Sequence, residues 1–245
     1  MSMEIGKVVG VFRYPVKSMA GISLNTASLG WRGLDGDRRF AFRRTEDRTG
    51  FPWLSASRLP EMILYEPVET DGQTPSSVRT PDARQLDLDG DELRGELSRK
   101  YGKELQLMKL DAGIFDDSAI SVISPATIRQ VEVESGLPLD IRRFRPNIVV
   151  DTFDGVAFGE DGWLGGILSF GAELGGPALS VTIRDKRCVM INLDPETAEA
   201  DARVMKAAVR LNRNNAGIYG TVIRTGEISI GQSVFLRLDE VRNFA

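Results

Sequence analysis

The feature that most constrains the fold is a succession of short apolar runs separated by turn residues. Such runs, bounded by Gly, Pro, Asn or Asp, are typical of β-strands, and 25 glycines supply the turns between them. Phe40 and Phe42 also alternate with Arg39, Ala41 and Arg43, which is the period of a half-buried strand. The expected strands are 8–12, 22–29, 40–42, 62–65, 86–88, 105–110, 120–123, 148–150, 179–183, 189–193, 218–223 and 234–238. The sequence therefore predicts a mainly β fold.

Three segments have helical signals instead. Residues 91–101 place acids first, bases late and Gly102 after the end. Ser124 and Pro125 form a cap and first turn for a helix that closes at Gly136. The third helix is expected at 195–210, with Asp194 as its cap. These few helices complete a fold class that is mainly β with a few helices.

The length of 245 residues allows one large domain or two small ones. A strand pattern stops in the polar run at 111–118, so we place a division there, with segments 1–115 and 116–245. Two intimate halves and two independent domains both fit this pattern, since all-β units often exceed 200 residues.

Charge and hydropathy narrow the functional classes. The net charge of −4 and the isoelectric point near 5.2 argue against a nucleic-acid-binding protein. No apolar stretch is long enough to span a membrane, and no signal peptide is evident. A single cysteine forms no internal disulfide, so we expect a cytoplasmic protein.

The chain has no histidine, and Cys188 is its one cysteine. These facts exclude a Ser-His-Asp or Cys-His nucleophile, a Cys/His zinc site and an iron–sulfur cluster held by this chain alone. Cys188 is then either a buried small apolar residue or a reactive thiolate beside Lys186 and Arg187. Neighbouring cations lower the pKa of a thiol, and the thiolate is both a nucleophile and a metal ligand. Free cysteine is nevertheless often buried, so this feature alone favours the buried interpretation.

Three motifs place cations near strand ends. Lys17 and Ser18 follow Tyr-Pro-Val, where they are either a solvated turn or a phosphate contact. Arg38 precedes a strand and is either an ion-pair partner of Asp35 or Asp37 or a ligand clamp. Arg145 and Asn147 bracket a proline before a buried strand, and this context favours an anion site over a solvated basic run.

Taken together, these motifs resemble the MOSC family, named for the C-terminal domain of molybdenum cofactor sulfurase. The phrases are Tyr-Pro-Val-Lys-Ser at 14–18, Asp-Arg-Arg-Phe at 37–40, Phe-Arg-Pro-Asn-Ile-Val at 144–149, Phe-Gly-Glu-Asp-Gly-Trp at 158–163, Arg-Cys with Asp-Pro-Glu-Thr at 187–197, and Gly-Glu-Ile-Ser-Ile-Gly at 226–231. They cover nearly the whole chain in the family's order. The resemblance is strongest to the branch that contains the mitochondrial amidoxime-reducing component.

The resemblance implies an N-terminal β-barrel domain and a MOSC β-barrel domain with molybdenum cofactor (molybdopterin) between them. It also implies pyridoxal phosphate binding. By this resemblance Cys188 is the catalytic residue and the metal ligand. The implied cofactor-binding residues are Lys17, Ser18, Arg38, Ser118, Arg145, Asn147, Arg187 and Tyr219.

The implied activity is reduction of small N-hydroxylated substrates, namely amidoximes, hydroxylamines and N-hydroxylated bases. Electrons would come from a separate ferredoxin, flavoprotein or cytochrome, because this chain has no cysteines for an iron–sulfur cluster of its own. The alternative is a sulfur or molybdenum-cofactor carrier that uses Cys188. The sequence departs from the amidoxime-reducing branch at Lys186, where serine is usual, and at Met19, where many relatives have cysteine.

Overall fold

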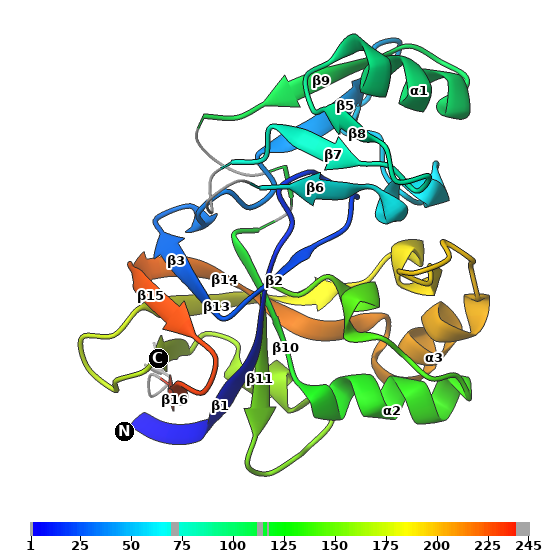
Figure 1. The fold of residues 1–245 in the computed structure, drawn as a ribbon. Helices are drawn as coiled ribbons and strands as arrows, with labels where there is room; N and C mark the ends of the chain where they lie inside the picture. The colour runs from blue at the N-terminus through cyan, green and yellow to red at the C-terminus, as the bar shows by residue number, and fades with distance from the viewer. Residues whose placement is uncertain (1, 70–73, 112–114, 117, 239–245) are drawn as a thin grey trace.

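The computed structural model describes residues 2–69, 74–111, 115, 116 and 118–238. Within these ranges strands dominate and three α-helices occur, so the mainly β prediction is confirmed. Figure 1 shows a barrel that carries both ends of the described chain, with a second unit stacked above it and two helices at its side.

The barrel is closed by seven strands of the described chain. Its order is β11-β10-β14-β13-β12-β16-β1, and β1 pairs back onto β11. The strands are β1 (Ser2–Arg13), β10 (Ile120–Ile123), β11 (Ile148–Thr152), β12 (Ile167–Phe170), β13 (Ala178–Lys186), β14 (Asn215–Arg224) and β16 (Ser233–Arg237). The first strand of the chain thus completes a sheet made otherwise from its second half.

Closure depends on the long strand β1. Its ladder shifts register twice, once against β16 and once against β11, so one strand bends from one neighbour to the other. At Gly6 a Cβ would lie 2.1 Å from the carbonyl oxygen of Asp151, so only glycine fits where the two strands meet. The barrel interior is apolar and includes Val8, Val11 and Ile218.

Two α-helices cover one side of the barrel. The parallel pair β10 and β11 is joined by α2 (Pro125–Ser135), as parallel strands require a crossover. Ser124 caps this helix by accepting a hydrogen bond from the Thr127 amide at 3.2 Å, as predicted. The helix α3 (Ala202–Asn212) packs beside α2 over an apolar cluster that includes Phe144 and Ile191.

The upper unit in Figure 1 contains a two-stranded and a three-stranded sheet. They are formed by β5 (Phe40–Arg44) with β9 (Leu105–Lys109), and by β6 (Glu66–Val68), β7 (Ser77–Arg79) and β8 (Gln85–Asp87), beside α1 (Asp91–Tyr101). Helix α1 has the predicted bounds and ends at Gly102 in the left-handed conformation. The core of this unit also includes Leu193 from the second half of the chain, so the two units pack together.

Smaller elements link the two units. They are β2 (Ile22–Leu24), β3 (Thr26–Gly30), β4 (Gly33–Leu34), β15 (Gly226–Ser229) and four 3-10 turns, η1 (Pro60–Leu64), η2 (Ile141–Phe144), η3 (Gly159–Trp163) and η4 (Val189–Asn192). Strand β2 extends the barrel sheet from β1, and β15-β3-β4 forms a separate sheet. The division between residues 115 and 116 stays a prediction.

Three predicted elements are wrong. Residues 62–65 lie in and just after η1, which Pro60 opens, and residues 189–193 lie in and just after η4. The third helix begins at Ala202 and not at Pro195, because Ala198 has a φ of 60°, which no α-helix contains. Asp194 caps a separate turn by accepting from the Glu196 amide at 2.9 Å. No helix of the described chain is long and apolar enough to cross a membrane.

Candidate functional site

A cavity of about 330 Å³ opens where the two units meet. Barrel elements, the loops that flank them and residues 51–57 of the upper unit all contribute to it. The described lining residues are Lys17, Ser18, Arg38, Phe51, Ser55, Ser57, Asp116, Arg143, Phe144, Arg145, Asp185, Lys186, Arg187, Cys188, Met190, Ile191 and Tyr219. Segments distant in sequence therefore share one site.

Seven of the nine site residues expected from the sequence line this cavity. They are Lys17, Ser18, Arg38, Arg145, Arg187, Cys188 and Tyr219. Asn147 lies behind them, where its Oδ1 accepts from Arg38 Nη1 at 3.0 Å. Ser118 is half-buried and is not among the described residues that line the cavity. The functional roles of all nine stay predictions.

Arg38 is held by a buried network at the rear of the cavity. Its side chain is 4% exposed and donates to Asp37 at 2.5 Å and to the Arg145 carbonyl at 3.1 Å, while Nε lies 2.5 Å from Asp116. Burial alone would lower the pKa of Arg38, but Asp37 and Asp116 raise it, so the guanidinium stays charged. Arg38 thus forms the expected ion pair with Asp37 and also lines the cavity, while its role as a ligand clamp stays a prediction.

Arg187 extends inward from the end of β13. It donates to the carbonyls of Phe144 at 2.6 Å and Ala216 at 2.7 Å. Its Nη2 lies 2.8 Å from Asp185 Oδ2, so the buried guanidinium is paired with a buried carboxylate. Because it also lines the cavity, this guanidinium adds positive charge to the site.

Two further cations approach from the other walls. Lys17 follows β1, and its Nζ donates to the Phe115 carbonyl at 2.8 Å and lies 3.8 Å from Asp116. Arg145 has a left-handed φ of 48°, which turns its side chain over the ring of Tyr14 at 4.3 Å. Burial lowers the pKa of Arg145, with Arg38 adding to the effect.

Cys188 lies at the rim of the cavity. Its backbone caps η4 rather than starting a strand, and its thiol is exposed. The buried interpretation of this cysteine is therefore wrong. Among the described residues no group of three or more His, Cys, Asp or Glu side chains is arranged to hold a metal ion. A metal bound at Cys188 would have to bring most of its other ligands with it.

The cavity is strongly cationic within an acidic chain. Six cationic side chains line it against the two carboxylates of Asp116 and Asp185. Burial raises the pKa of Tyr219 well above its usual range, and the two carboxylates add to the effect. Tyr219 is therefore a neutral hydrogen-bond donor, and the site as a whole favours an anionic ligand.

Sequence reasoning missed several of the lining residues. Arg143 lies in a basic run and donates to the Asn192 carbonyl at 2.9 Å, a contact that crosses 49 residues. Asp116 adjoins the predicted Ser118, and Asp185 adjoins the Lys-Arg-Cys phrase, so proximity to known motifs was the available signal for both. No sequence signal pointed to Phe51.

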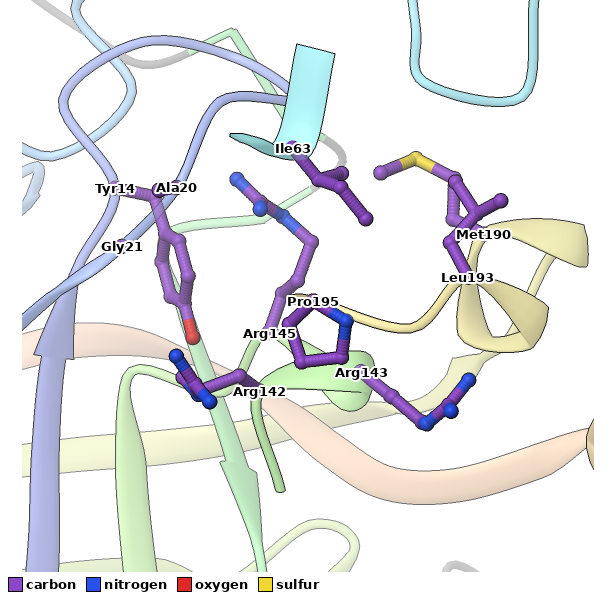
Figure 2. Close-up of a pocket in the computed structure, with 10 residues that line it drawn as sticks. All are labelled: Tyr14, Ala20, Gly21, Ile63, Arg142, Arg143, Arg145, Met190, Leu193 and Pro195. Atoms are coloured by element: carbon purple, nitrogen blue, oxygen red, sulfur yellow. The ribbon is translucent and has the colours of Figure 1, made fainter. Parts of the chain in front are cut away.

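A second, small cavity adjoins the first and shares Arg143, Arg145 and Met190 with it. Figure 2 shows Tyr14, Ile63 and the three arginines around this space of about 40 Å³. That volume suffices for a few water molecules. Burial raises the pKa of Tyr14 to about 12, so its hydroxyl is neutral. This hydroxyl makes no hydrogen bond to the described residues, so it gives the small cavity a polar group that a water molecule can bind.

Comparison with known proteins agrees with this architecture. A family model for the MOSC domain matches residues 102–235, and one for the MOSC N-terminal beta barrel domain matches residues 5–119. Mitochondrial amidoxime reducing component 2 of Rattus norvegicus is 24% identical over 297 residues, covering 96% of this chain and 85% of that protein. The YUAD protein from Bacillus subtilis has a similar fold, with a TM-score of 0.54 at 14% identity over 98% of this chain and 99% of that one.

Proposed function

The chain belongs to the MOSC domain family, and on that premise we propose that it binds molybdenum cofactor and reduces N-hydroxylated compounds. The observation that carries the proposal is one cavity that joins the only thiol of the chain to six cationic side chains. The rat relative, by its name a component of amidoxime reduction, supports the substrate class.

The residues of the cavity fit such a group. Its volume of about 330 Å³ falls at the lower end of the range of ligand pockets. A pterin phosphate needs cations and donors, which Lys17, Arg145 and Arg187 offer. Molybdenum accepts a soft thiolate, and the exposed Cys188 is the only one in the chain.

When bound, molybdenum cofactor would supply the two-electron chemistry that removes oxygen from N–OH. The residues of the chain would bind and orient this group and donate a hydrogen bond in the site. Cys188 would hold the metal, Arg38 and Arg187 would orient the anionic part through their fixed hydrogen bonds, and Tyr219 would donate a hydrogen bond from its neutral hydroxyl.

Electrons would come from a separate protein, a ferredoxin, a flavoprotein or a cytochrome. The chain lacks both a cysteine set for an iron–sulfur cluster and the Gly-x-Gly-x-x-Gly fingerprint after a strand. We also propose the cytoplasm as the compartment, since an exposed free thiol is kept reduced there.

Reduction of benzamidoxime by cofactor-loaded protein tests this function. NADH alone should give no benzamidine, because the sequence has no dinucleotide-binding fingerprint after a strand. A low-potential dye with its reductant should start the reaction. Cofactor-free protein is the control and should be inactive. Loaded protein that reduces no N-hydroxylated compound under chemical reduction would contradict the proposal.

The same purified protein distinguishes the reductase from two alternatives, a sulfur or molybdenum-cofactor carrier and a pyridoxal phosphate-binding protein. A carrier would retain molybdenum or a persulfide at the exposed Cys188 thiol and hand it on without turnover. Pyridoxal phosphate, whose phosphate would also suit the cations, would form a borohydride-reducible adduct with a lysine such as Lys17.

A further inference from the structure

Reduction of an N–OH bond consumes protons, and the histidine-free chain has to supply them in another way. The balance is R–NH–OH + 2 H⁺ + 2 e⁻ → R–NH₂ + H₂O, in which the N–O bond breaks and the oxygen leaves as water. The two electrons come from the external donor protein. The described cavity lining offers two carboxyl groups, Asp116 and Asp185, and one neutral phenol, Tyr219.

These three groups differ in their surroundings. Asp116 faces two cations, since its carboxylate lies 2.5 Å from Arg38 Nε and 3.8 Å from Lys17 Nζ. Burial and the two carboxylates make the Tyr219 phenol a weaker acid than usual, which disfavours proton release. Asp185 is 2% exposed, lines the cavity and faces a mixed set of charges.

The contacts of Asp185 engage one oxygen. Oδ2 accepts from Ser121 Oγ at 2.7 Å and lies 2.8 Å from Arg187 Nη2. No hydrogen bond from the described residues reaches Oδ1. That oxygen can therefore carry a proton without displacing a partner, and the position next to the cavity lets the proton reach a bound substrate.

We propose that Asp185 is the acid that delivers a proton to the departing oxygen of the N-hydroxylated substrate and is then reprotonated from solvent. This inference rests on the proposed reductase function. The charged and titratable groups around it are Arg187 on the same segment, Arg38 from the loop before β5, Asp116 from the loop before β10, and Tyr219 on β14.

The electrostatics of the site agree with this role. Burial raises the pKa of Asp185 to about 6, Asp116 adds to the rise, and Arg187, Ser121 and Arg38 oppose it. A general acid works best when its pKa lies near the working pH, so this carboxyl can be partly protonated and still release its proton.

The test compares wild type with Asp185→Asn and Asp185→Glu, each loaded with cofactor and assayed across pH with benzamidoxime and a chemical reductant. We expect Asp185→Asn to keep its molybdenum, to lose at least about 100-fold in kcat and to lose the pH dependence centred near pH 6. Asp185→Glu, which keeps a carboxyl beside Arg187, should recover part of the rate with a displaced midpoint. Glu160→Gln is the matched control, because it removes another buried carboxyl with a raised pKa that lies outside the described cavity lining.

A second readout does not depend on turnover. The infrared band of a protonated carboxyl, taken as wild type minus Asp185→Asn, should titrate near pH 6 in loaded and in cofactor-free protein. An unchanged pH profile in Asp185→Asn, or no such band, would overturn this inference while leaving the reductase function standing. Wild type that reduces no N-hydroxylated compound would overturn the proposed function and, with it, the donor role.

Discussion

Replacing Arg38 by methionine tests whether the rear wall of the cavity is a coupled ion-pair network. Arg38 is 4% exposed and Asp37 is fully buried, so methionine would leave the Asp37 carboxylate in the interior. Its carboxylate would still accept a hydrogen bond from the Tyr14 amide at 2.6 Å. Removing one partner of a buried pair costs about 3–5 kcal/mol. That is a large part of a total stability of about 5–15 kcal/mol.

Neutralising the stranded carboxylate should restore part of this loss. Asparagine at position 37 can still accept from the Tyr14 amide, so Asp37→Asn/Arg38→Met should regain about 2 kcal/mol over Arg38→Met alone. Guanidinium unfolding of cofactor-free protein measures each free energy from the midpoint and slope. The exposed Arg32→Met is the control and should change stability by less than about 0.5 kcal/mol. A loss below about 1 kcal/mol in Arg38→Met, or strict additivity of the two single changes, would show that Arg38 and Asp37 are not a coupled buried pair.

Three further predictions concern Gly217 beside the cavity, the cap of α2 and the buried carboxyl of Asp185. Gly217 has a φ of +88°, and a Cβ there would lie 2.6 Å from the Val122 carbonyl oxygen and 3.1 Å from Arg187 Nη2. Gly217→Ala should therefore lower the unfolding free energy by more than about 1 kcal/mol and lower molybdenum loading. Normal loading would contradict a role for this close approach in shaping the site. Ser124→Ala should cost about 1 kcal/mol of unfolding free energy by uncapping α2, and no loss would contradict the cap. The pKa of Asp185 in the fold is about 6, above its ordinary 3.8, so its contribution to stability is present at low pH and is lost as the pH rises through 6. As the pH rises from 3.8 to about 6, the unfolding free energy of wild type should fall by about 3 kcal/mol relative to that of Asp185→Asn. Parallel pH curves for the two proteins would contradict the raised pKa of Asp185.

Local signals in the sequence predicted the parts of the fold that depend on local chemistry. Helix α1 has the predicted bounds because its end charges and Gly102 act within one turn. The strand predictions at 62–65 and 189–193 are wrong because a short apolar run is equally compatible with a strand and a buried turn. The start of α3 was misplaced because Asp194 and Pro195 resemble a helix cap, whereas Asp201 is the cap in the fold.

Only part of the site could be predicted from the sequence. Lys17, Arg38, Arg145 and Arg187 were expected together because their motifs occur in a known order, and the structure brings them to one cavity. Asp185 and Arg143 were missed because their roles arise from contacts across dozens of residues. Closure of the barrel by β1 could not be predicted for the same reason, because no local pattern shows that the first strand pairs with β11 and β16.

The proposed function depends above all on molybdenum being held in the cavity by the thiolate of Cys188. X-ray absorption at the molybdenum edge, on wild type and Cys188→Ser produced in a host that makes the cofactor, tests it most directly. We expect one fewer sulfur neighbour per molybdenum in any metal that Cys188→Ser retains, and no N-hydroxy reduction by that variant. Equal sulfur coordination and equal activity in the two proteins would contradict it.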